Sequence, residues 1–191
     1  MAEPLVPDEL WEAIAPLLPR HMEFHPIANP NWQKQNGVSL LTAAGKVNAP
    51  FFLAMGDHLF ESSILDSLTA HADLTRLNLA VDRKIKAIFD LDDAMKVRTE
   101  GNRIVAIGKK LESYNAIDTG IFLCPEITFE YLRRVLKEDD CSLADGVRLM
   151  AEERNALAID IGDAWWQDVD TPQMLQYAER QMSERMQSAA T

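Results

Sequence analysis

The sequence has few cysteines and no long apolar run. Only Cys124 and Cys141 occur, without C-x-x-C spacing or a nearby group of histidines, which argues against a disulfide framework and against a zinc site. No apolar stretch approaches the length of a membrane span, and the N-terminus lacks the basic start and apolar core of a signal peptide. We therefore expect reduced thiols and a cytoplasmic protein with no membrane partner.

Basic residues are also scarce. The chain has 19 lysines and arginines against 30 acidic residues, and its formal net charge is −11. Such a charge opposes non-specific binding to nucleic acid and to anionic membrane surfaces. We therefore expect no nucleic-acid partner, and a phosphate-bearing ligand would need a cation to help hold it.

The order of the segments predicts the fold class. The 191 residues are 47% hydrophobic, which fits one domain with a substantial core. Strand-like and helical segments alternate, an order typical of crossover units, so we expect an α/β fold with a mainly parallel sheet. The expected helices are Pro7–Leu18, Ser39–Lys46, Phe60–Ala70, Phe129–Lys137, Leu143–Ala151 and one from Pro172; the expected strands are Phe51–Met55, Arg76–Val81, Ala116–Cys124 and Ala156–Ile161, with a small antiparallel insertion at Lys86–Asp90, Ala94–Thr99 and Arg103–Gly108.

The apolar run FFLAMGDHLF stops on Gly56, Asp57 and His58. A buried parallel strand is a continuous apolar run, and ligands of open α/β sheets bind beyond the carboxyl ends of such strands. Asp57 would lie at that place. Gly-Asp is also ordinary turn or cap chemistry before a helix, and this stretch alone leaves both interpretations open.

A second group of carboxylates lies in DAWWQDVDTPQML. Alternation puts Asp168 and Asp170 on the same side of an extended segment, where they repel each other unless a cation or a proton lies between them. Mg²⁺ prefers one or two carboxylates together with substrate phosphates. A metal clamp formed with Asp57 is one interpretation, and a capping site before the helix at Pro172 is the other.

Four stretches together resemble a known family. They are MGDHLF, LAVDRKIKAIFDLDDAMKV, IGKKLESYNAIDTGIF and WWQDVDTP, in this order, and they resemble the sugar- and polyol-phosphate nucleotidyltransferases, in particular the inositol-1-phosphate cytidylyltransferase branch. The resemblance covers roughly residues 23–182. It implies a Rossmann-like three-layer fold and transfer of a nucleoside monophosphate, CMP from CTP in that branch, to a sugar or polyol phosphate such as inositol 1-phosphate. It also favours the ligand-binding interpretation of both carboxylate groups.

The resemblance implies roles for individual residues. Asp57 and Asp168 match the two catalytic aspartates that bind Mg²⁺, and Asp170 stands where the WxDxGTP pattern of relatives has glycine, which leaves the choice between Asp168 and Asp170 open. Lys109 matches a lysine near the acceptor phosphate. The other matches are Asp118, Thr119 and Gly120 at the sugar or polyol, and Gly37 and Ser39 near the base and ribose of the nucleotide.

The sequence departs from the family at its N-terminal side. Family members begin with a strand and a glycine-rich LxAGxGxRL loop, followed by a Pro-Lys pair. None of the eight glycines here has G-x-G spacing, and no Pro-Lys occurs, so the backbone donors that cradle phosphates and a main cation are absent. We therefore expect a domain without its first strand, impaired transfer, and self-association through an uncovered sheet edge. A non-catalytic remnant that binds a phosphate ligand or a partner protein is the alternative.

Residues 1–21, MAEPLVPDELWEAIAPLLPRH, resemble instead the N-terminus of insertion-sequence transposases. We expect them to form a separate fused segment before a nucleotidyltransferase domain at residues 22–191. An unrelated amphipathic helix that covers the sheet is equally compatible with this stretch. Neither interpretation implies DNA binding, because the first 24 residues carry five acids against one arginine.

Overall fold

The computed structural model describes residues 23–47 and 50–189. The helix expected at Pro7–Leu18, and residues 1–21 as a whole, lie outside this range. No helix in the described ranges is both long and apolar enough to cross a membrane.

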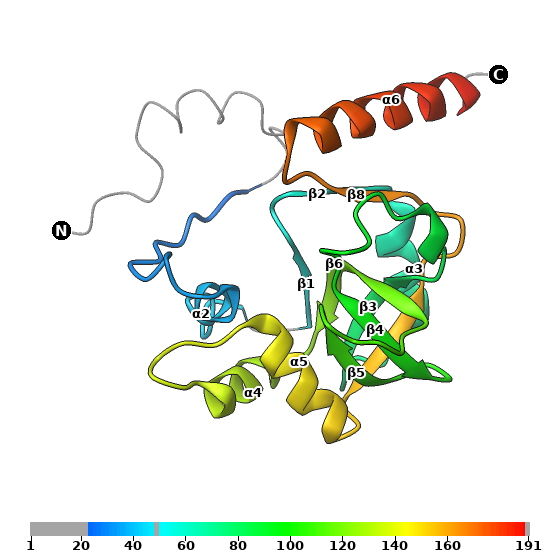
Figure 1. The fold of residues 1–191 in the computed structure, drawn as a ribbon. Helices are drawn as coiled ribbons and strands as arrows, with labels where there is room; N and C mark the ends of the chain where they lie inside the picture. Colours follow the sequence, from blue (N-terminus) through cyan, green and yellow to red (C-terminus); the bar gives the residue numbers. More distant parts are fainter. Residues whose placement is uncertain (1–22, 48–49, 190–191) are drawn as a thin grey trace.

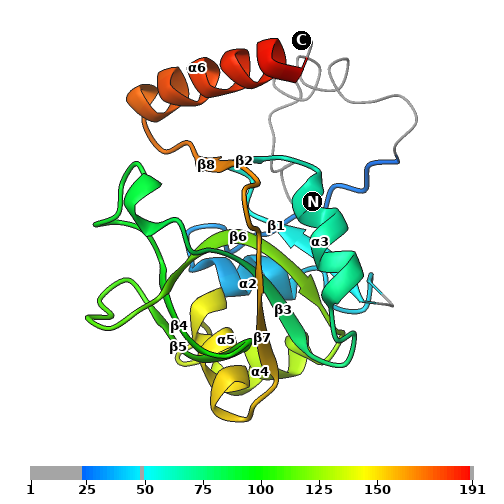
Figure 2. The same cartoon turned by 90° about the vertical axis from the view of Figure 1, so that its right-hand side faces the viewer.

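A six-stranded sheet forms the middle of the molecule (Figures 1 and 2). Its strands lie in the order β1-β6-β3-β7-β5-β4, and β4 also pairs with β6. They are β1 (Phe51–Ala54), β3 (Leu77–Asp82), β4 (Lys96–Glu100), β5 (Arg103–Gly108), β6 (Ala116–Cys124) and β7 (Ala156–Asp160). Two further strands, β2 (His58–Phe60) and β8 (Trp166–Asp168), pair only with each other and form a separate ribbon.

Helices cover both faces of the six-stranded sheet, which confirms the α/β fold class. On one face α4 (Thr128–Val135) and α5 (Leu143–Glu152) pack over the sheet, with α2 (Asn36–Leu41) beside them. On the other face lies α3 (Ser63–His71). All six residues of β3 are buried, as expected for a strand covered on both sides.

Two hydrophobic clusters correspond to the two faces. Alternate residues of β3 divide between them, because successive side chains of a strand point to opposite faces. Leu77, Leu79 and Val81 join the cluster that contains α5, whereas Ala80 joins the cluster of α3. The last helix, α6 (Pro172–Ala189), follows the ribbon and extends away from the sheet (Figure 1).

The expected mainly parallel pairing is wrong for the described strands. Only β3 and β7 pair in parallel; the other pairings are antiparallel. The reason is topological, since β1, β3 and β7 share one direction but β6 runs the opposite way and lies between β1 and β3. Segment alternation along the sequence predicts the common direction, but it does not show which strand lies between two others.

Two local predictions are also corrected. Phe60 does not begin a helix but ends β2, where it pairs with Trp166, and α3 begins only at Ser63. The strand expected at Lys86–Asp90 is a turn region that follows a 3-10 helix at Ile85–Ala87. There Ile85 and Ile88 pack against the cluster of α3. The apolar residues that made this segment look like a strand instead hold an irregular segment against the sheet.

Candidate active site

The two predicted metal aspartates come together at the ribbon of β2 and β8. Asp57 directly precedes β2 and Asp168 ends β8, and the register of the ribbon pairs His58 with Asp168. The backbone N–H of Val169 donates to the carbonyl oxygen of Asp57 at 2.9 Å. Two segments more than a hundred residues apart in the sequence are therefore held side by side.

The carboxylate of Asp57 is held by its neighbour. Its Oδ1 lies 2.7 Å from Nδ1 of His58, and the Asp57 side chain is 54% exposed. The His58 ring is stacked against the Trp166 ring, with centroids 5.7 Å apart and planes 11° from parallel. Asp57 is thus oriented from one side and open to solvent on the other, as a ligand-binding carboxylate would be.

Asp168 is more enclosed than Asp57. Burial raises the pKa of the Asp168 carboxyl, and the nearby Asp170 and Asp90 raise this pKa further, while His58 opposes the shift. Nε2 of Gln167 donates to Oδ1 of Asp168 at 2.9 Å. A carboxylate repelled by other acids gains from a cation beside it.

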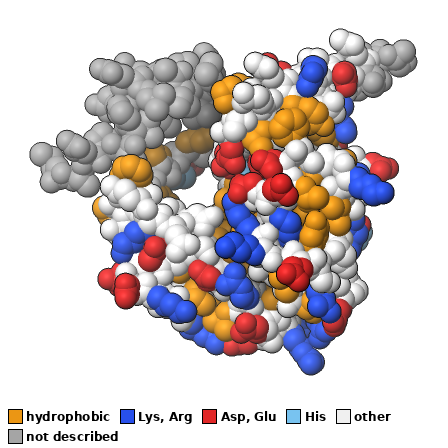
Figure 3. Space-filling view, in the orientation of Figure 1, with side chains coloured by type: hydrophobic (Ala, Val, Ile, Leu, Met, Phe, Trp, Pro, Cys, Tyr) orange, Lys and Arg blue, Asp and Glu red, His pale blue; other side chains and the backbone are white. Residues whose placement is uncertain are grey.

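A cavity of about 380 Å³ lies next to these aspartates. It contains a site of mixed charge, because acidic and basic side chains both line it. On the face seen in Figure 3, acidic side chains gather directly above a group of lysines and arginines. The cavity brings together five of the predicted site residues: Lys109, Asp118, Gly120, Asp168 and Asp170.

Asp118 is the acid on the central strand β6 that the cavity reaches. Burial raises its pKa to about 6, against the opposing effects of the Gly120 N–H and of His58. The Gly120 N–H donates to Oδ1 of Asp118 at 2.7 Å. The second carboxylate oxygen has no such backbone donor among the described contacts, so a ligand hydroxyl could donate to it.

Lys109 is held by an acid of its own. Its Nζ lies 2.7 and 2.8 Å from the two carboxylate oxygens of Asp93, and both side chains are about half exposed. Nζ of Lys96 donates to the carbonyl oxygen of Lys109 at 2.9 Å and fixes the backbone there. A phosphate that reached Lys109 would therefore have to replace Asp93.

Four predicted residues are not part of the cavity lining: Asp57, which lies beside Asp168 at the ribbon, and Thr119, Gly37 and Ser39. Thr119 is fully buried, and its hydroxyl donates to the carbonyl oxygen of Ala80 at 2.8 Å. A Cβ on Gly37 would come within 2.7 Å of the carbonyl oxygen of Cys141, so this glycine permits close packing next to α5. The hydroxyl of Ser39 accepts a hydrogen bond from Asn29.

The residues before Gly37 reach the cavity instead. Gln35 and Asn36 line it, at the start of α2. The amide oxygen of Asn36 accepts the backbone N–H of Leu143 at 2.8 Å and so joins α2 to the start of α5. The residues assigned from the sequence match, Gly37 and Ser39, lie two or three positions after the residues of this segment that line the cavity.

Sequence reasoning missed two further charged contributors to the cavity, Arg148 and the acidic turn with Asp90 and Asp93. Arg148 comes from α5, where its guanidinium pairs with Asp145 at 2.7 Å. An arginine among LADGVRLM has no sequence feature that separates it from a solvated helix residue. The acidic run FDLDD was visible in the sequence, but its proximity to Lys109 depends on the β4–β5 hairpin.

The donor set fits a cation that also takes ligands from a substrate. The described residues contain no group of three or more His, Cys, Asp or Glu side chains arranged to hold a metal ion. Two carboxylates at the ribbon, Asp57 just before β2 and Asp168 at the end of β8, are nevertheless the donor set that Mg²⁺ uses when phosphates complete its coordination.

Comparisons with known proteins agree with this geometry. No family model matches the chain. Over 161 residues it is 31% identical to the bifunctional IPC transferase and DIPP synthase of Aquifex aeolicus, and over 162 residues 34% identical to that of Rubrobacter xylanophilus. Each match covers 84% of this chain, and 35% and 36% of the two relatives. The chain thus spans about a third of the length of these curated relatives.

Solved structures give the same result. The inositol-1-phosphate CTP transferase of T. maritima aligns with a TM-score of 0.69 and 30% identity, over 76% of this chain and 60% of that one. A UDP-glucose pyrophosphorylase in complex with UDP-glucose aligns with a TM-score of 0.65 over 80% of this chain and 63% of that one, and at 18% identity it supports the fold alone. From the shared sequence and the shared fold, the matched part of this chain belongs to the sugar- and polyol-phosphate nucleotidyltransferase family.

Proposed function

We propose that this chain transfers CMP from CTP to a polyol or sugar phosphate such as inositol 1-phosphate, with release of pyrophosphate. One observation carries the proposal. The described fold gathers Lys109, Asp118 and Asp168 around one cavity, with Asp57 directly before β2, the strand that pairs with β8. The printed activities of the relatives, IPC transferase and inositol-1-phosphate CTP transferase, supply the substrate classes.

The protein itself takes little part in the covalent chemistry of this reaction. An oxygen of the acceptor phosphate attacks the α-phosphorus of CTP, a new P–O bond forms, and the bond from the α-phosphorus to the bridging oxygen breaks, so pyrophosphate leaves with the electron pair. A phosphate monoester is already ionised near neutral pH, so no general base is needed, and His58 is not assigned that role. Positioning and neutralisation of charge are what such a site supplies.

Two residues of the cavity would bind the acceptor, which is the phosphorylated polyol or sugar. Lys109 would exchange its ion pair with Asp93 for the acceptor phosphate, since both are exposed enough to separate. Asp118 would accept a hydrogen bond from a hydroxyl of the polyol with the oxygen that Gly120 does not occupy. Asp118 lies on β6 and Lys109 follows directly after β5, and the two residues would fix both ends of a small phosphorylated polyol.

Asp57 and Asp168 are the residues that would hold a magnesium ion, and Asp170, exposed at the same cavity, is the further candidate. When bound, the ion would offset the negative charge of the triphosphate. Burial is the main cause of the raised pKa of Asp168, and Asp170 and Asp90 add to it; a cation at this place would offset the negative charge of these acids.

A second candidate function is binding without transfer. The absence of G-x-G spacing and of a Pro-Lys pair from the sequence favours it, because such groups provide donors to a triphosphate. In that case the chain would bind the phosphorylated acceptor through Lys109 and Asp118 and leave CTP unreacted.

A pyrophosphate-release assay tests the proposal. Purified chain is incubated with Mg²⁺, inositol 1-phosphate and each of the four NTPs in turn, and Asp57→Asn is assayed beside the wild type. Asp66→Asn is the matched control, because Asp66 is an exposed acid on α3 outside the lining of the cavity.

Release that requires CTP, is lost in Asp57→Asn and is retained in Asp66→Asn would support the proposal. No release with any NTP, from protein that shows a cooperative unfolding transition, would contradict transfer. Calorimetric titration with inositol 1-phosphate, comparing wild type with Lys109→Gln, then decides whether binding alone is retained.

A further inference from the structure

Trp166 lies between the proposed metal aspartates and the interior of the protein. It is two residues before Asp168 on β8, so both side chains point to the same side of the strand. Both also line the cavity, and Trp166 is only 9% exposed. Because the two residues belong to the same short strand, the position of Trp166 helps to set the position of the Asp168 carboxylate.

Trp166 also influences the position of the Asp57 carboxylate, through the imidazole of His58. The imidazole stacks on the indole and carries the contact from Nδ1 to Asp57 at 2.7 Å. On its other side the imidazole meets Gly120, where a Cβ would come within 2.7 Å of two ring atoms. His58 is thus confined between Trp166 and β6, and the plane of the indole sets the plane of the imidazole.

The indole is itself held by a buried acid. Nε1 of Trp166 donates to Oδ2 of Asp82 at 3.0 Å, and Asp82, at the end of β3, is 3% exposed. Oδ1 of Asp82 accepts the backbone N–H of Lys84 at 2.6 Å and lies 3.0 Å from the Lys84 ammonium. Both oxygens of this carboxylate are therefore used.

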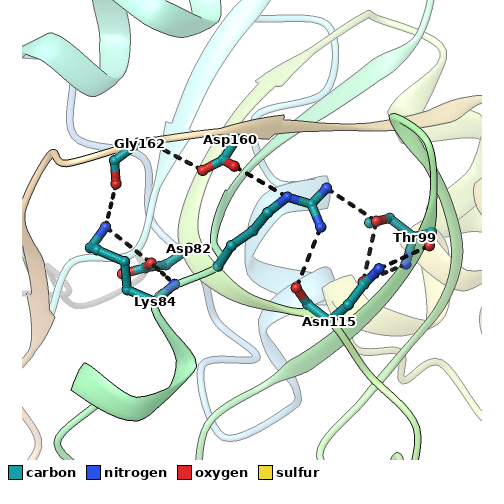
Figure 4. Close-up of polar contacts among 7 residues, drawn as sticks. Asp82, Lys84, Thr99, Asn115, Asp160 and Gly162 are labelled. Atoms are coloured by element: carbon teal, nitrogen blue, oxygen red, sulfur yellow. Dashed lines mark hydrogen bonds and ion pairs between the residues drawn. The ribbon is translucent and has the colours of Figure 1, made fainter.

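Lys84 ties the same acid to the chain that leads into β8. Its ammonium donates to the carbonyl oxygen of Gly162, as Figure 4 shows, and to that of Ala164 at 3.2 Å. Asp82 and Lys84 therefore fix both the ring of Trp166 and the backbone just before it. The Lys84 ammonium, whose side chain is 38% exposed, offsets the charge of Asp82 and so lets this carboxylate be buried.

A second acid at the same edge serves as a comparison. Asp160 ends β7, and its register partner in the parallel neighbour β3 is Val81, next to Asp82. Asp160 also uses both oxygens, one for the Gly162 N–H and one for Arg83, which continues to Thr99 and Asn115 (Figure 4). Its contact with Arg83 leads toward β4 and away from Trp166, whereas its contact with Gly162 lies on the segment before β8 that Lys84 also binds; the amide oxygen of an asparagine can keep this second contact.

We propose that Asp82 is a positioning residue of the metal site: by holding the Trp166 indole it fixes the His58 imidazole, and through it the Asp57 carboxylate, relative to Asp168. This inference rests on the proposed function only for its choice of a divalent cation as the ligand. Removal of an outer hydrogen-bond partner of a metal site costs on the order of 10- to 100-fold in metal affinity, and we expect a loss of this size when the Asp82 contact is broken.

Asp82→Asn and Asp160→Asn form a matched pair of variants. An amide has one acceptor oxygen, so each substitution must break one of the two contacts of the original carboxylate. Mn²⁺ alone is the probe, and its affinity for the full chain is measured by the electron paramagnetic resonance of the free ion. Asp57→Asn identifies which part of the bound Mn²⁺ belongs to the site rather than to the acidic surface.

A second readout does not involve metal. The ring protons of His58, assigned with His58→Gln, are displaced in the proton NMR spectrum by the stacked indole. We expect Asp82→Asn to weaken site-bound Mn²⁺ on the order of 10- to 100-fold and to move the His58 resonances toward their unstacked positions. Asp160→Asn should change neither. Equal effects of the two variants would overturn the proposal, and so would the absence of an effect in both Asp82→Asn and Trp166→Phe.

Trp166→Phe keeps the inference testable if Asp82→Asn does not fold or turns its oxygen toward the indole. Phenylalanine retains an aromatic ring beside His58 but cannot donate to Asp82. Because both substitutions break one contact, their effects on Mn²⁺ affinity should not add in the double variant. Additive effects, or a wild type without Mn²⁺ binding that depends on Asp57, would contradict the proposal. Absence of CTP-dependent pyrophosphate release would contradict only the proposed function.

Discussion

Gly120 lies against the ring of His58, so closely that a Cβ on Gly120 would come within 2.7 Å of both Cδ2 and Nε2. Its φ of 73° also lies in the left-handed region. This contact joins the six-stranded sheet to the ribbon that carries the proposed metal aspartates, and it gives the first prediction.

We expect Gly120→Ala to lower stability by on the order of 1 to 3 kcal/mol from backbone strain, and also to displace His58. Gly101→Ala is the control, because Gly101 has a similar φ of 62° but nothing within 4 Å of a Cβ. Urea unfolding measures the loss of stability from backbone strain, which both variants share. CTP-dependent pyrophosphate release measures the effect of displacing His58, which only Gly120→Ala should cause. Equal activity losses in the two variants would show that the His58 contact is unimportant.

The buried carboxyl of Asp118 predicts a dependence of stability on pH. Its pKa is raised from 3.8 to about 6, chiefly by burial, so the folded state binds a proton more tightly than the unfolded state. The cost of ionising Asp118 is absent below about pH 4 and is present in full above about pH 6. Asp118→Asn carries no such cost, and its amide oxygen can still accept the Gly120 N–H.

The stability advantage of Asp118→Asn over wild type should therefore grow by roughly 2 to 3 kcal/mol between pH 4 and pH 7. Urea unfolding of both proteins at several pH values measures this difference. A difference that stays constant with pH would mean that Asp118 is not the source. We expect the same variant to bind inositol 1-phosphate more weakly, because it lacks the second acceptor oxygen.

The ion pair between Lys109 and Asp93 predicts opposite effects of two substitutions. Lys109→Gln should raise the KM for inositol 1-phosphate by roughly 10- to 100-fold, the value of a hydrogen bond to a charged group. Asp93→Asn should lower this KM by roughly two- to fivefold, because an exposed ion pair worth up to about 1 kcal/mol no longer competes with the phosphate. Steady-state kinetics with varied acceptor measure both.

Lys110→Gln is the control for this pair of variants, since Lys110 is an exposed neighbour outside the cavity lining. A lower affinity in Asp93→Asn would show that Asp93 orients Lys109 for binding instead of occupying it.

Helices α4 and α5 are joined by a contact that acid should break. The Glu153 carboxylate accepts from the Arg134 guanidinium and, at 2.6 Å, from the Tyr131 hydroxyl, and these two lower its pKa to about 2. A lowered carboxyl pKa stabilises the fold above the unfolded value of 4.5, and this stabilisation is lost as the pH falls toward 2.

Glu153→Gln should therefore be less stable than wild type at pH 7, and the gap should narrow below pH 4. Guanidinium unfolding at pH 7 and pH 3 compares the two, with the neighbouring Glu152→Gln as control. A gap of the same size at both pH values would contradict the assignment.

The sequence was most informative where periodicity and motif agreed. The strand at Ala116–Cys124 and the helix at Leu143–Ala151 were predicted to within a residue of what is observed, because a long apolar run and a regular amphipathic pattern each admit one structure. The motif match also located Lys109, Asp118 and Asp168 at one cavity. Asp57 and Asp168 were expected to meet because each follows an apolar segment at a sheet edge.

The failures have one physical source, which is that side-chain direction depends on pairing partners far along the chain. Thr119 lies between Asp118 and Gly120, and alternation turns it away from the cavity toward Ala80. Phe60 was assigned to a helix because its pairing with Trp166 cannot be seen locally. Asp82 follows the strand expected at Arg76–Val81 and was assigned no role, because only the fold brings it to the indole of Trp166.

The separation of β2 and β8 from the main sheet has a consequence for how such proteins diversify. Of the carboxylates that would hold the cation, Asp168 belongs to a three-pair ribbon and Asp57 directly precedes it, whereas Asp118 belongs to the six-stranded sheet and Lys109 follows directly after its strand β5. No backbone ladder in the described residues joins the two. Substitutions on the six-stranded sheet that leave Asp82 and Gly120 unchanged can therefore reshape the acceptor pocket while the proposed cation site beside the ribbon is retained, and a single scaffold can serve different alcohol phosphates.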